Sequence, residues 1–304
     1  MIKFFKKYPK MILFLSLMIL MGVSYGIYLH WYNHNNEENQ KLYDDLSQEA
    51  WTSISDDKAT SGSTQLYNGS TDSTTSENNA NEDNQIDEFL NGCGDKAFYE
   101  KYVISKPDLK QYRDINHDVV GYLSIPDTII SYPTLQDAED NDYYLKHNID
   151  GSKGYPGCIY IENYNHKDFE DSATLIYGHN MKNDTMFGTL DEYREPEYRE
   201  KNKYIFIYTD NYIKIYEVVA CSVYSSDHLL SHDFEMDENE HWSFGALSDD
   251  DQIQIYEKLK AFKANNSYFD GEGLTRDDKC IALATCSGEN RYVVLGKLIY
   301  DIKL

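Results

Sequence analysis

The chain has 304 residues, of which 41% are hydrophobic, and it carries 52 acidic against 28 basic side chains, a formal net charge of −24. This length and composition accommodate one or two domains with a buried core. Recognition of phosphate requires clustered lysine and arginine, so the charge balance argues against a nucleic-acid-binding protein. We interpret most of the acids as a solvated surface.

The N-terminus differs from the rest of the chain. Residues 1–10 contain four lysines and no acid, and residues 11–29 contain no charged side chain. An apolar helix of about 20 residues spans the hydrocarbon core of a bilayer, and flanking lysines favour the cytoplasmic side. The pattern predicts a cytoplasmic basic tail over 1–10 and a single transmembrane anchor over 11–30, with the later residues outside the cell membrane. A cleaved signal peptide is the alternative, but no small-x-small cleavage site follows the run.

The next part of the chain is polar. Residues 31–97 read as a juxtamembrane segment followed by a linker, because 58–85 is rich in Ser, Thr, Asn, Gly and acids and contains almost nothing that could be buried. Such a composition predicts a flexible tether. Globular character begins near Phe98, so 98–304 is predicted to form one extracellular domain.

That domain consists of short apolar, β-rich runs separated by turn residues. A short helix is predicted after Lys106 and a longer one within 248–266, with Ser248 as its N-cap. The runs predicted as strands are Val119–Ile125, Ile129–Thr134, Gly157–Glu162, Ala173–Gly178, Tyr204–Thr209, Tyr212–Tyr224, Cys280–Cys286 and Arg291–Asp301. Many short strands with few helices predict a mostly β fold, either a barrel or a sandwich.

The cysteines are scattered and form no CxxC pair, which argues against a zinc site. They are Cys93, Cys158, Cys221, Cys280 and Cys286. Cys158, Cys221 and Cys280 lie in or beside β-rich runs, so we expect them to be core thiols. Asp249–Asp251 complement the dipole of the predicted helix better than they suggest calcium. We therefore expect no metal and no cofactor.

Three residues can carry chemistry together. Cys286 ends one predicted strand, Arg291 begins the next, and His179 follows another strand far away in the sequence. Individually they have ordinary interpretations, as a core thiol, a solvated arginine and a surface histidine. However, only Ser287–Asn290 separate the two final strands, so a hairpin would set Cys286 and Arg291 opposite each other, with Cα atoms about 4.5–5.5 Å apart. A guanidinium can then stabilise a thiolate or an oxyanion, and a histidine can move the proton.

The residues also carry a family resemblance over roughly Asp114–Leu304. The segments "INHDVVGYLSIPDTIISYPTLQ", "DNDYYLKHNIDG", "GCIYIE", "TLIYGHNMKNDTMFGTL" and "LATCS…RYVVLGKL" resemble, in this order, those of sortases, the membrane-anchored cysteine transpeptidases of Gram-positive bacteria. The "YGHNM" and "MFGTL" runs, with the long insert before the cysteine strand, resemble class B in particular.

The resemblance implies an eight-stranded β-barrel with a few helices, placed outside the membrane and facing the cell wall. It implies Cys286 as the nucleophile, His179 as the general acid and base, and Arg291 as the stabiliser of substrate and oxyanion. Five neighbouring residues are candidates for substrate binding: Tyr177, Asn180, Ala284, Thr285 and Ser287.

The implied reaction cleaves a C-terminal sorting signal after its Thr through a thioester, which an amine then resolves. The implied partners are the sorting signal of a surface protein and an amine of a peptidoglycan cross-bridge or of a pilin lysine. Many class B members have a longer segment between Cys and Arg, and a Ser where this chain has Ala284. These departures leave open the sorting signal and a pilin-polymerising subtype. A cysteine hydrolase and a catalytically silent binding domain are further alternatives.

Overall fold

The structure is a computed structural model, and it describes residues 9–60, 100–163, 165–171, 173–224, 268–269, 278–287 and 290–304. The helix predicted within 248–266, Cys93 and most of the predicted linker lie outside these ranges. The chain divides into two compact units, Met1–Tyr43 and Asp44–Leu304.

Helix α2 covers Pro9–Thr60. It includes the predicted anchor and continues through residues that the sequence suggested to be juxtamembrane segment and the beginning of the tether. Within the described ranges, no helix combines the length and the apolar character needed to cross a membrane. The transmembrane helix predicted over 11–30 is therefore not confirmed by the structure.

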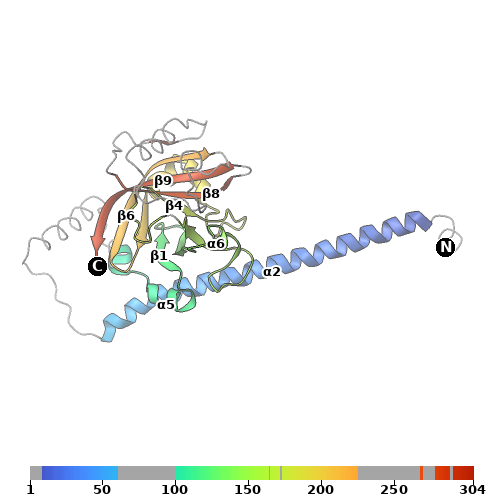
Figure 1. Ribbon diagram of the computed structural model, residues 1–304, viewed down its shortest axis with the longest axis horizontal. Helices are drawn as coiled ribbons and strands as arrows, with labels where there is room; N and C mark the ends of the chain where they lie inside the picture. The colour runs from blue at the N-terminus through green and yellow to red at the C-terminus, as the bar shows by residue number, and fades with distance from the viewer. Residues whose placement is uncertain are drawn as a thin grey trace, which may run out of the picture. The chain divides into compact units, whose positions relative to one another are not determined.

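The second unit is built on a closed β-barrel, which confirms the prediction of a mostly β fold with eight barrel strands (Figure 1). The barrel strands are β1 (Val119–Ser124), β2 (Ser131–Leu135), β3 (Ile159–Ile161), β4 (Ala173–Tyr177), β5 (Tyr204–Tyr208), β6 (Tyr212–Tyr224), β8 (Cys280–Ser287) and β9 (Asn290–Lys303). Their order is β5–β1–β2–β3–β4–β8–β9–β6, and the pairing of β6 with β5 closes the ring. The β2–β3 and β4–β8 pairs are parallel, and the other barrel pairs are antiparallel.

Strand β6 is long enough to pair with two different strands along one edge. Strand β9 pairs with β6 along nearly its whole length, while β5 and then β7 (Tyr268–Phe269) pair with successive parts of β6. The register of β6 against β9 shifts between Ile215 and Tyr216 and again between Val218 and Ala220. Such bulges increase the local bend and twist, which helps a sheet to close.

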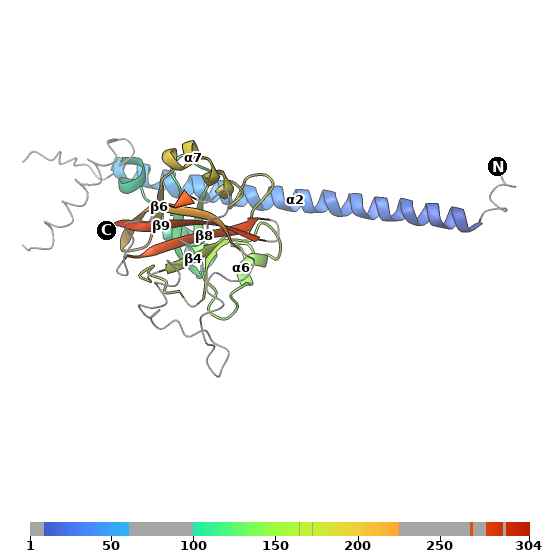
Figure 2. The same cartoon turned by 90° about the horizontal axis from the view of Figure 1, so that it is seen from above.

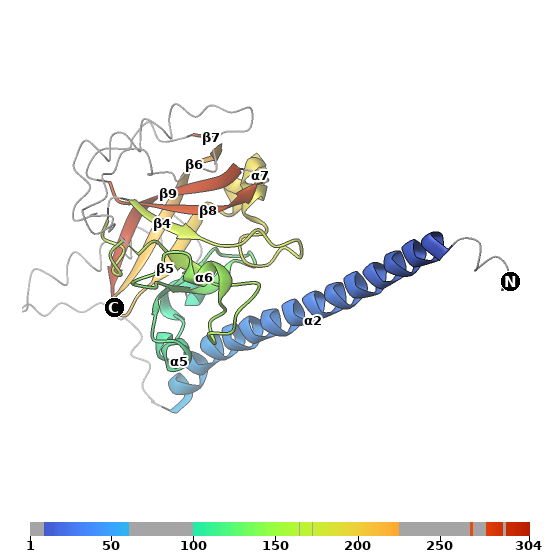
Figure 3. The same cartoon turned by 45° about the vertical axis from the view of Figure 1, so that its right-hand side comes forward.

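Short helical elements connect the strands. They are the π-helix η1 (Glu100–Ile104), α5 (Leu109–Ile115), α6 (Tyr143–Lys146), the 3₁₀-helix η2 (Leu190–Arg194) and α7 (Pro196–Lys201). The carboxylate of Asp108 caps α5 by accepting a hydrogen bond from the Lys110 main-chain N–H at 2.9 Å. The sequence predicted α5 but not α6, whose single turn lies in front in Figure 3. This small helix is important for the active site.

The core includes both faces of several strands. Every residue of β1 is buried, and in β8 the neighbours Leu283 and Ala284, which point to opposite faces, are both fully buried. Many tyrosines are also buried, including Tyr122, Tyr208 and Tyr216. Both faces of these strands are therefore covered, which explains why they read as apolar runs rather than as alternating patterns.

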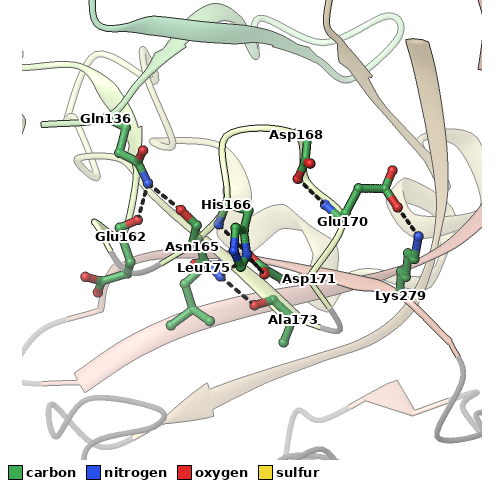
Figure 4. Close-up of polar contacts among 10 residues, drawn as sticks. All are labelled: Gln136, Glu162, Asn165, His166, Asp168, Glu170, Asp171, Ala173, Leu175 and Lys279. Carbon is green, nitrogen blue, oxygen red and sulfur yellow. Dashed lines mark hydrogen bonds and ion pairs between the residues drawn. The ribbon is translucent and has the colours of Figure 1, made fainter. Parts of the chain in front are cut away.

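The loop between β3 and β4 is held by buried amides (Figure 4). The Asn165 side chain accepts a hydrogen bond from the Leu175 N–H at 3.0 Å and donates to the Ala173 carbonyl at 2.9 Å. The Gln136 side chain donates to the carbonyls of Glu162 and Asn165, both at 2.7 Å. These contacts fix the start of β4, the strand that leads to the predicted catalytic histidine.

A buried lysine ties the same loop to the barrel. Lys214 of β6 is fully buried, and its ammonium group pairs with Glu170 of the loop and, at 2.9 Å, with Asp301 of β9. Glu170 also pairs with Lys279, which directly precedes β8 (Figure 4). A buried charge is costly unless it is paired, so this lysine depends on both carboxylates.

Candidate active site

Cys286 and Arg291 are direct partners in the antiparallel β8–β9 pair, as the sequence predicted. Figure 2 shows the two strands side by side. Directly opposed residues point to the same face of a sheet, so the thiol and the guanidinium share one face. Both residues are half-buried. Among the described residues, the guanidinium makes one long hydrogen bond, to the Asn290 carbonyl at 3.4 Å, which leaves donors for a ligand.

His179 is brought to this pair by strand β4. Strands β4 and β8 run parallel, and Tyr177, the last residue of β4, is paired with Ala284. His179 lies two residues after Tyr177, and Cys286 lies two residues after Ala284. The parallel register therefore carries both residues past the same end of the barrel.

Hydrogen bonds continue this pairing beyond the end of β4. They join Gly178 N–H to the Ala284 carbonyl at 3.2 Å, the Thr285 hydroxyl to the Gly178 carbonyl at 2.8 Å, and the Asn180 side-chain amide to the Cys286 carbonyl at 2.7 Å. The main chain on both sides of His179 is thus bonded to the main chain and side chains around Cys286. The segment that carries His179 therefore lies beside the segment that carries Cys286, because the β4–β8 and β8–β9 pairs share β8.

The imidazole ring of His179 is held by the segment between β2 and β3. Its Nε2 lies 2.7 Å from the main-chain carbonyl oxygen of Leu145, and its ring centroid lies 4.9 Å from that of Tyr155. Burial lowers the pKa of His179 below its ordinary value, and the hydrogen bond to Leu145 opposes this shift. The neutral imidazole is therefore the form favoured at neutral pH.

Two tyrosines lie on the same face of the sheet as Cys286. Tyr177 pairs with Tyr160 of β3, and their ring centroids are 5.7 Å apart. Burial and the neighbouring carboxylate of Glu162 raise the pKa of Tyr177 well above its usual range, while the positive charge of Arg291 opposes the shift. Burial likewise raises the pKa of Tyr160, so both tyrosines are neutral hydroxyl groups near Cys286 and Arg291.

The five predicted substrate-binding residues differ in accessibility. Ala284 is fully buried and Thr285 is 2% exposed, so the contacts described above give them an internal role in positioning Cys286. Asn180 is exposed, while Tyr177 and Ser287 are half-buried. Substrate binding by these three residues stays a prediction.

Sequence reasoning did not single out Arg194. Its Nη2 donates to the Ser287 hydroxyl at 3.2 Å, and its guanidinium lies over the Tyr292 ring, 4.7 Å from the centroid. Arg194 therefore supports the residues that follow Cys286 and Arg291 in their strands. Nothing in the local sequence around Arg194, about ninety residues before Ser287, indicates this contact. The Leu145 carbonyl was also missed, because a main-chain group has no sequence signature.

The other cysteines in the described ranges differ from Cys286. Cys158 and Cys221 are buried, which supports their predicted role as core thiols. Burial raises the pKa of the Cys280 thiol to about 12. A thiol with such a pKa is a poor nucleophile at neutral pH. Cys286, at the other end of β8 and beside Arg291, is the cysteine whose surroundings suit a nucleophile.

The chain is similar in sequence to known proteins. The sortase-domain family model matches residues 123–299. The chain is 34% identical over 199 residues to sortase B of Listeria monocytogenes, covering 64% of this chain and 75% of that protein. It is 28% identical over 204 residues to sortase B of Staphylococcus aureus, again covering 64% of this chain and 75% of the relative.

Solved structures agree with the sequence comparison. The sortase B structure of Clostridium perfringens superimposes with a TM-score of 0.53 at 26% identity and covers 64% of this chain and 100% of its own. The sortase B structure of Listeria monocytogenes gives a TM-score of 0.51 at 31% identity and covers 63% of this chain and 100% of its own.

A closed eight-stranded barrel that brings a cysteine, a histidine and an arginine to one end defines the sortase class, and the chain belongs to the sortase family. Its curated relatives and the solved structures above are class B enzymes, so the chain is a class B-like sortase.

Proposed function

We propose that this protein is a cysteine transpeptidase that cleaves the C-terminal sorting signal of surface proteins and transfers the acyl group to an amine of a peptidoglycan cross-bridge. The observation that carries the proposal is the pairing of Cys286 with Arg291 beside the bonded segment that holds His179. Membership of the sortase family supports the same reaction class.

The chemistry begins with proton transfer. Because His179 is neutral near pH 7, it can accept the proton of the Cys286 thiol when substrate enters. The thiolate then attacks the carbonyl carbon that precedes the scissile bond. Arg291 donates hydrogen bonds to the oxyanion, since its guanidinium stays cationic and carries several donors in a fixed geometry.

The tetrahedral intermediate then collapses. The C–N bond breaks, the leaving amine takes a proton from the His179 imidazolium, and a thioester remains on Cys286. An incoming amine attacks the thioester, His179 removes its proton, and the C–S bond breaks to release the Cys286 thiolate, which takes the proton back from the His179 imidazolium. Asn180, Ser287 and Tyr177 lie near this reaction centre and are our candidates for contacts with the sorting signal.

The test is product analysis with the purified full chain. The protein is incubated with a library of sorting-signal peptides and an amine that mimics a cross-bridge, and the products are identified by mass spectrometry. We expect an aminolysis product and a thioester on the peptide that contains Cys286. Hydrolysis alone would favour a cysteine hydrolase, and a preference for a pilin lysine peptide would favour pilin polymerisation.

The cysteine variants make the test specific. Cys286→Ala should abolish both the thioester and the products while the protein remains folded. Cys280→Ala is the matched control, because it makes the same change at the opposite end of β8, and it should retain turnover. Turnover in Cys286→Ala would remove the basis of the proposal, and so would failure of the unaltered protein to cleave any peptide of the library.

We also propose, from the sequence pattern, that residues 11–30 attach the protein to the cell membrane with the catalytic domain facing the wall. The uncharged run at 11–29 after four lysines supports this placement. Fractionation of cells that express the full chain should place it in the membrane fraction, resistant to extraction by salt and alkali. Release by either treatment would contradict the proposal.

A further inference from the structure

The end of helix α6 has a specific arrangement of main-chain carbonyls. The Tyr144 carbonyl accepts a hydrogen bond from the Cys158 N–H at 3.0 Å, and the Lys146 carbonyl accepts one from the Gly154 N–H at 2.8 Å. The last carbonyls of a helix have no partner within the helix and must find one elsewhere. The carbonyl between these two, that of Leu145, lies 2.7 Å from the Nε2 atom of His179.

This contact determines which nitrogen of His179 carries the proton in the neutral ring. A carbonyl oxygen can only accept a hydrogen bond, so Nε2 must be the donor. With Nε2 protonated, the neutral imidazole has its lone pair on Nδ1. The opposite tautomer would place two lone pairs against each other at 2.7 Å and lose the hydrogen bond.

A second contact shows how the ring is turned. A Cβ atom built on Gly157 would lie 3.4 Å from Cδ2 of His179, and Cδ2 is bonded to Nε2 in the ring. The Cδ2–Nε2 edge therefore faces α6 and the loop that follows it. Nδ1 lies on the other side of the ring, away from this segment.

We propose that His179 exchanges protons with Cys286 and with the substrate through Nδ1, and that the main-chain carbonyl of Leu145 is the positioning group that selects this tautomer. The proposal rests on the proposed transpeptidase function. In the first step, the S–H bond of Cys286 breaks and an Nδ1–H bond forms, while Nε2–H stays bonded to Leu145. The same Nδ1 proton later moves to the leaving amine, so the ring does not have to turn between steps.

Gly157 leaves room for the carbonyls at the end of α6. A Cβ atom at position 157 would lie 2.7 Å from the Tyr144 carbonyl oxygen and 3.2 Å from the Leu145 carbonyl oxygen. Gly157→Ala should therefore displace the positioning group. Its φ of +70° also disfavours alanine, so a control for backbone strain is needed. Gly151 has a φ of +78° in the same loop and open space around its Cβ position, so Gly151→Ala carries the strain without the displacement.

The direct test is ¹⁵N NMR of the full chain labelled at histidine, with the signals of His179 identified by their loss in His179→Gln. We expect a protonated Nε2 and an unprotonated Nδ1 in the neutral ring. A neutral ring protonated at Nδ1, or an even mixture of the two tautomers, would overturn the proposal. This measurement needs no substrate, so its result is independent of whether the transpeptidase assignment holds.

Kinetics of the two glycine variants complete the test. A misplacement near 1 Å at a catalytic group can cost about 10²-fold in rate. We expect kcat/KM to fall by about that factor in Gly157→Ala, together with a mixed tautomer signal. Gly151→Ala should retain both the signal and most of the activity. A Gly157→Ala variant that folds, keeps the Nε2–H signal and keeps full activity would show that Gly157 is not needed to position the Leu145 carbonyl. Equal losses of activity in both variants would assign the effect to backbone strain.

Discussion

Cys286 and Arg291 face each other across the β8–β9 pair, and beyond them this ladder has one further pair, formed by Ser287 and Asn290. A shift of one residue in the register of a strand turns every side chain to the other face. The placement of these two side chains on one face therefore depends on the register of the whole hairpin. That register is set by the buried residues of both strands, such as Leu283 and Val294, which are themselves partners.

In the proposed mechanism, the side chain at position 291 donates hydrogen bonds to the oxyanion in a fixed geometry. We expect Arg291→Lys to lower kcat by about 10²-fold, because a single ammonium cannot reproduce the geometry of the guanidinium at an oxyanion. Arg113→Lys makes the same change in α5, where the half-buried guanidinium bonds to the Val119 carbonyl and to Asp210, and it should retain activity. Steady-state kinetics with a cleaved sorting-signal peptide measures both variants. Near-normal turnover in Arg291→Lys would limit this arginine to a structural role.

The hydroxyl of Thr285 should contribute more to the free energy of unfolding than the hydroxyl of Thr174. Thr285→Val leaves the buried Gly178 carbonyl without its donor, so we expect a loss of about 1–2 kcal/mol in the free energy of unfolding and a lower kcat. The hydroxyl of Thr174 is buried without a hydrogen-bond partner among the described residues, so Thr174→Val should be neutral or stabilising. Urea unfolding measures the difference. A similar cost for the two variants would show that the bond to Gly178 contributes little.

The cysteines should differ in reactivity towards iodoacetamide. Burial raises the pKa of Cys280 to about 12, so its thiolate is scarce at pH 8. We expect rapid alkylation of Cys286 and slow alkylation of Cys280, Cys158 and Cys221, followed by mapping of the modified peptides. Faster modification of Cys280 than of Cys286 in the folded protein would contradict the assignment of the nucleophile.

Protonation of His179 should destabilise the fold. Its pKa is lowered below the ordinary value near 6.5 because the ring is buried, so the unfolded chain binds more protons between the two pKa values. The free energy of unfolding should therefore decrease as the pH falls below about 6.5, and part of this decrease should be absent in His179→Gln. Urea titrations of both proteins near pH 7.5 and pH 5 provide the comparison. A difference between them that does not change with pH would exclude this linkage.

Lys214 and Lys279 share a carboxylate but differ in burial. Lys214→Met leaves Glu170 and Asp301 without their buried partner. Because both carboxylates are partly exposed, we expect a loss of about 2–3 kcal/mol in the free energy of unfolding, below the full cost of breaking a buried pair. Lys279→Met removes a partly exposed pair and should cost less than about 1 kcal/mol. Equal costs in urea unfolding would show that burial of Lys214 has no energetic consequence.

Local signals in the sequence predicted the barrel strands and one pair of candidate catalytic residues. The eight apolar runs correspond to the eight barrel strands, and the short SGEN segment was enough to predict that Cys286 and Arg291 are opposite each other. Hairpins are determined by neighbouring residues, because turn length and the positions of buried side chains set their register. His179 was also singled out from the sequence, as a histidine that follows a predicted strand, but no local pattern relates it to β8.

The tertiary structure alone decided how these parts are held. The parallel pairing of β4 with β8 joins segments about a hundred residues apart, and no turn between them encodes its register. The burial of Lys214, the contact of Arg194 with Ser287 and the use of the Leu145 carbonyl all depend on groups from distant elements. The order of the amino acids specifies which side chains are available and which hairpin joins the thiol to the guanidinium. The histidine's orientation was decided only by the folded barrel, because a main-chain carbonyl is present at every residue and gains a specific role only through its position in space.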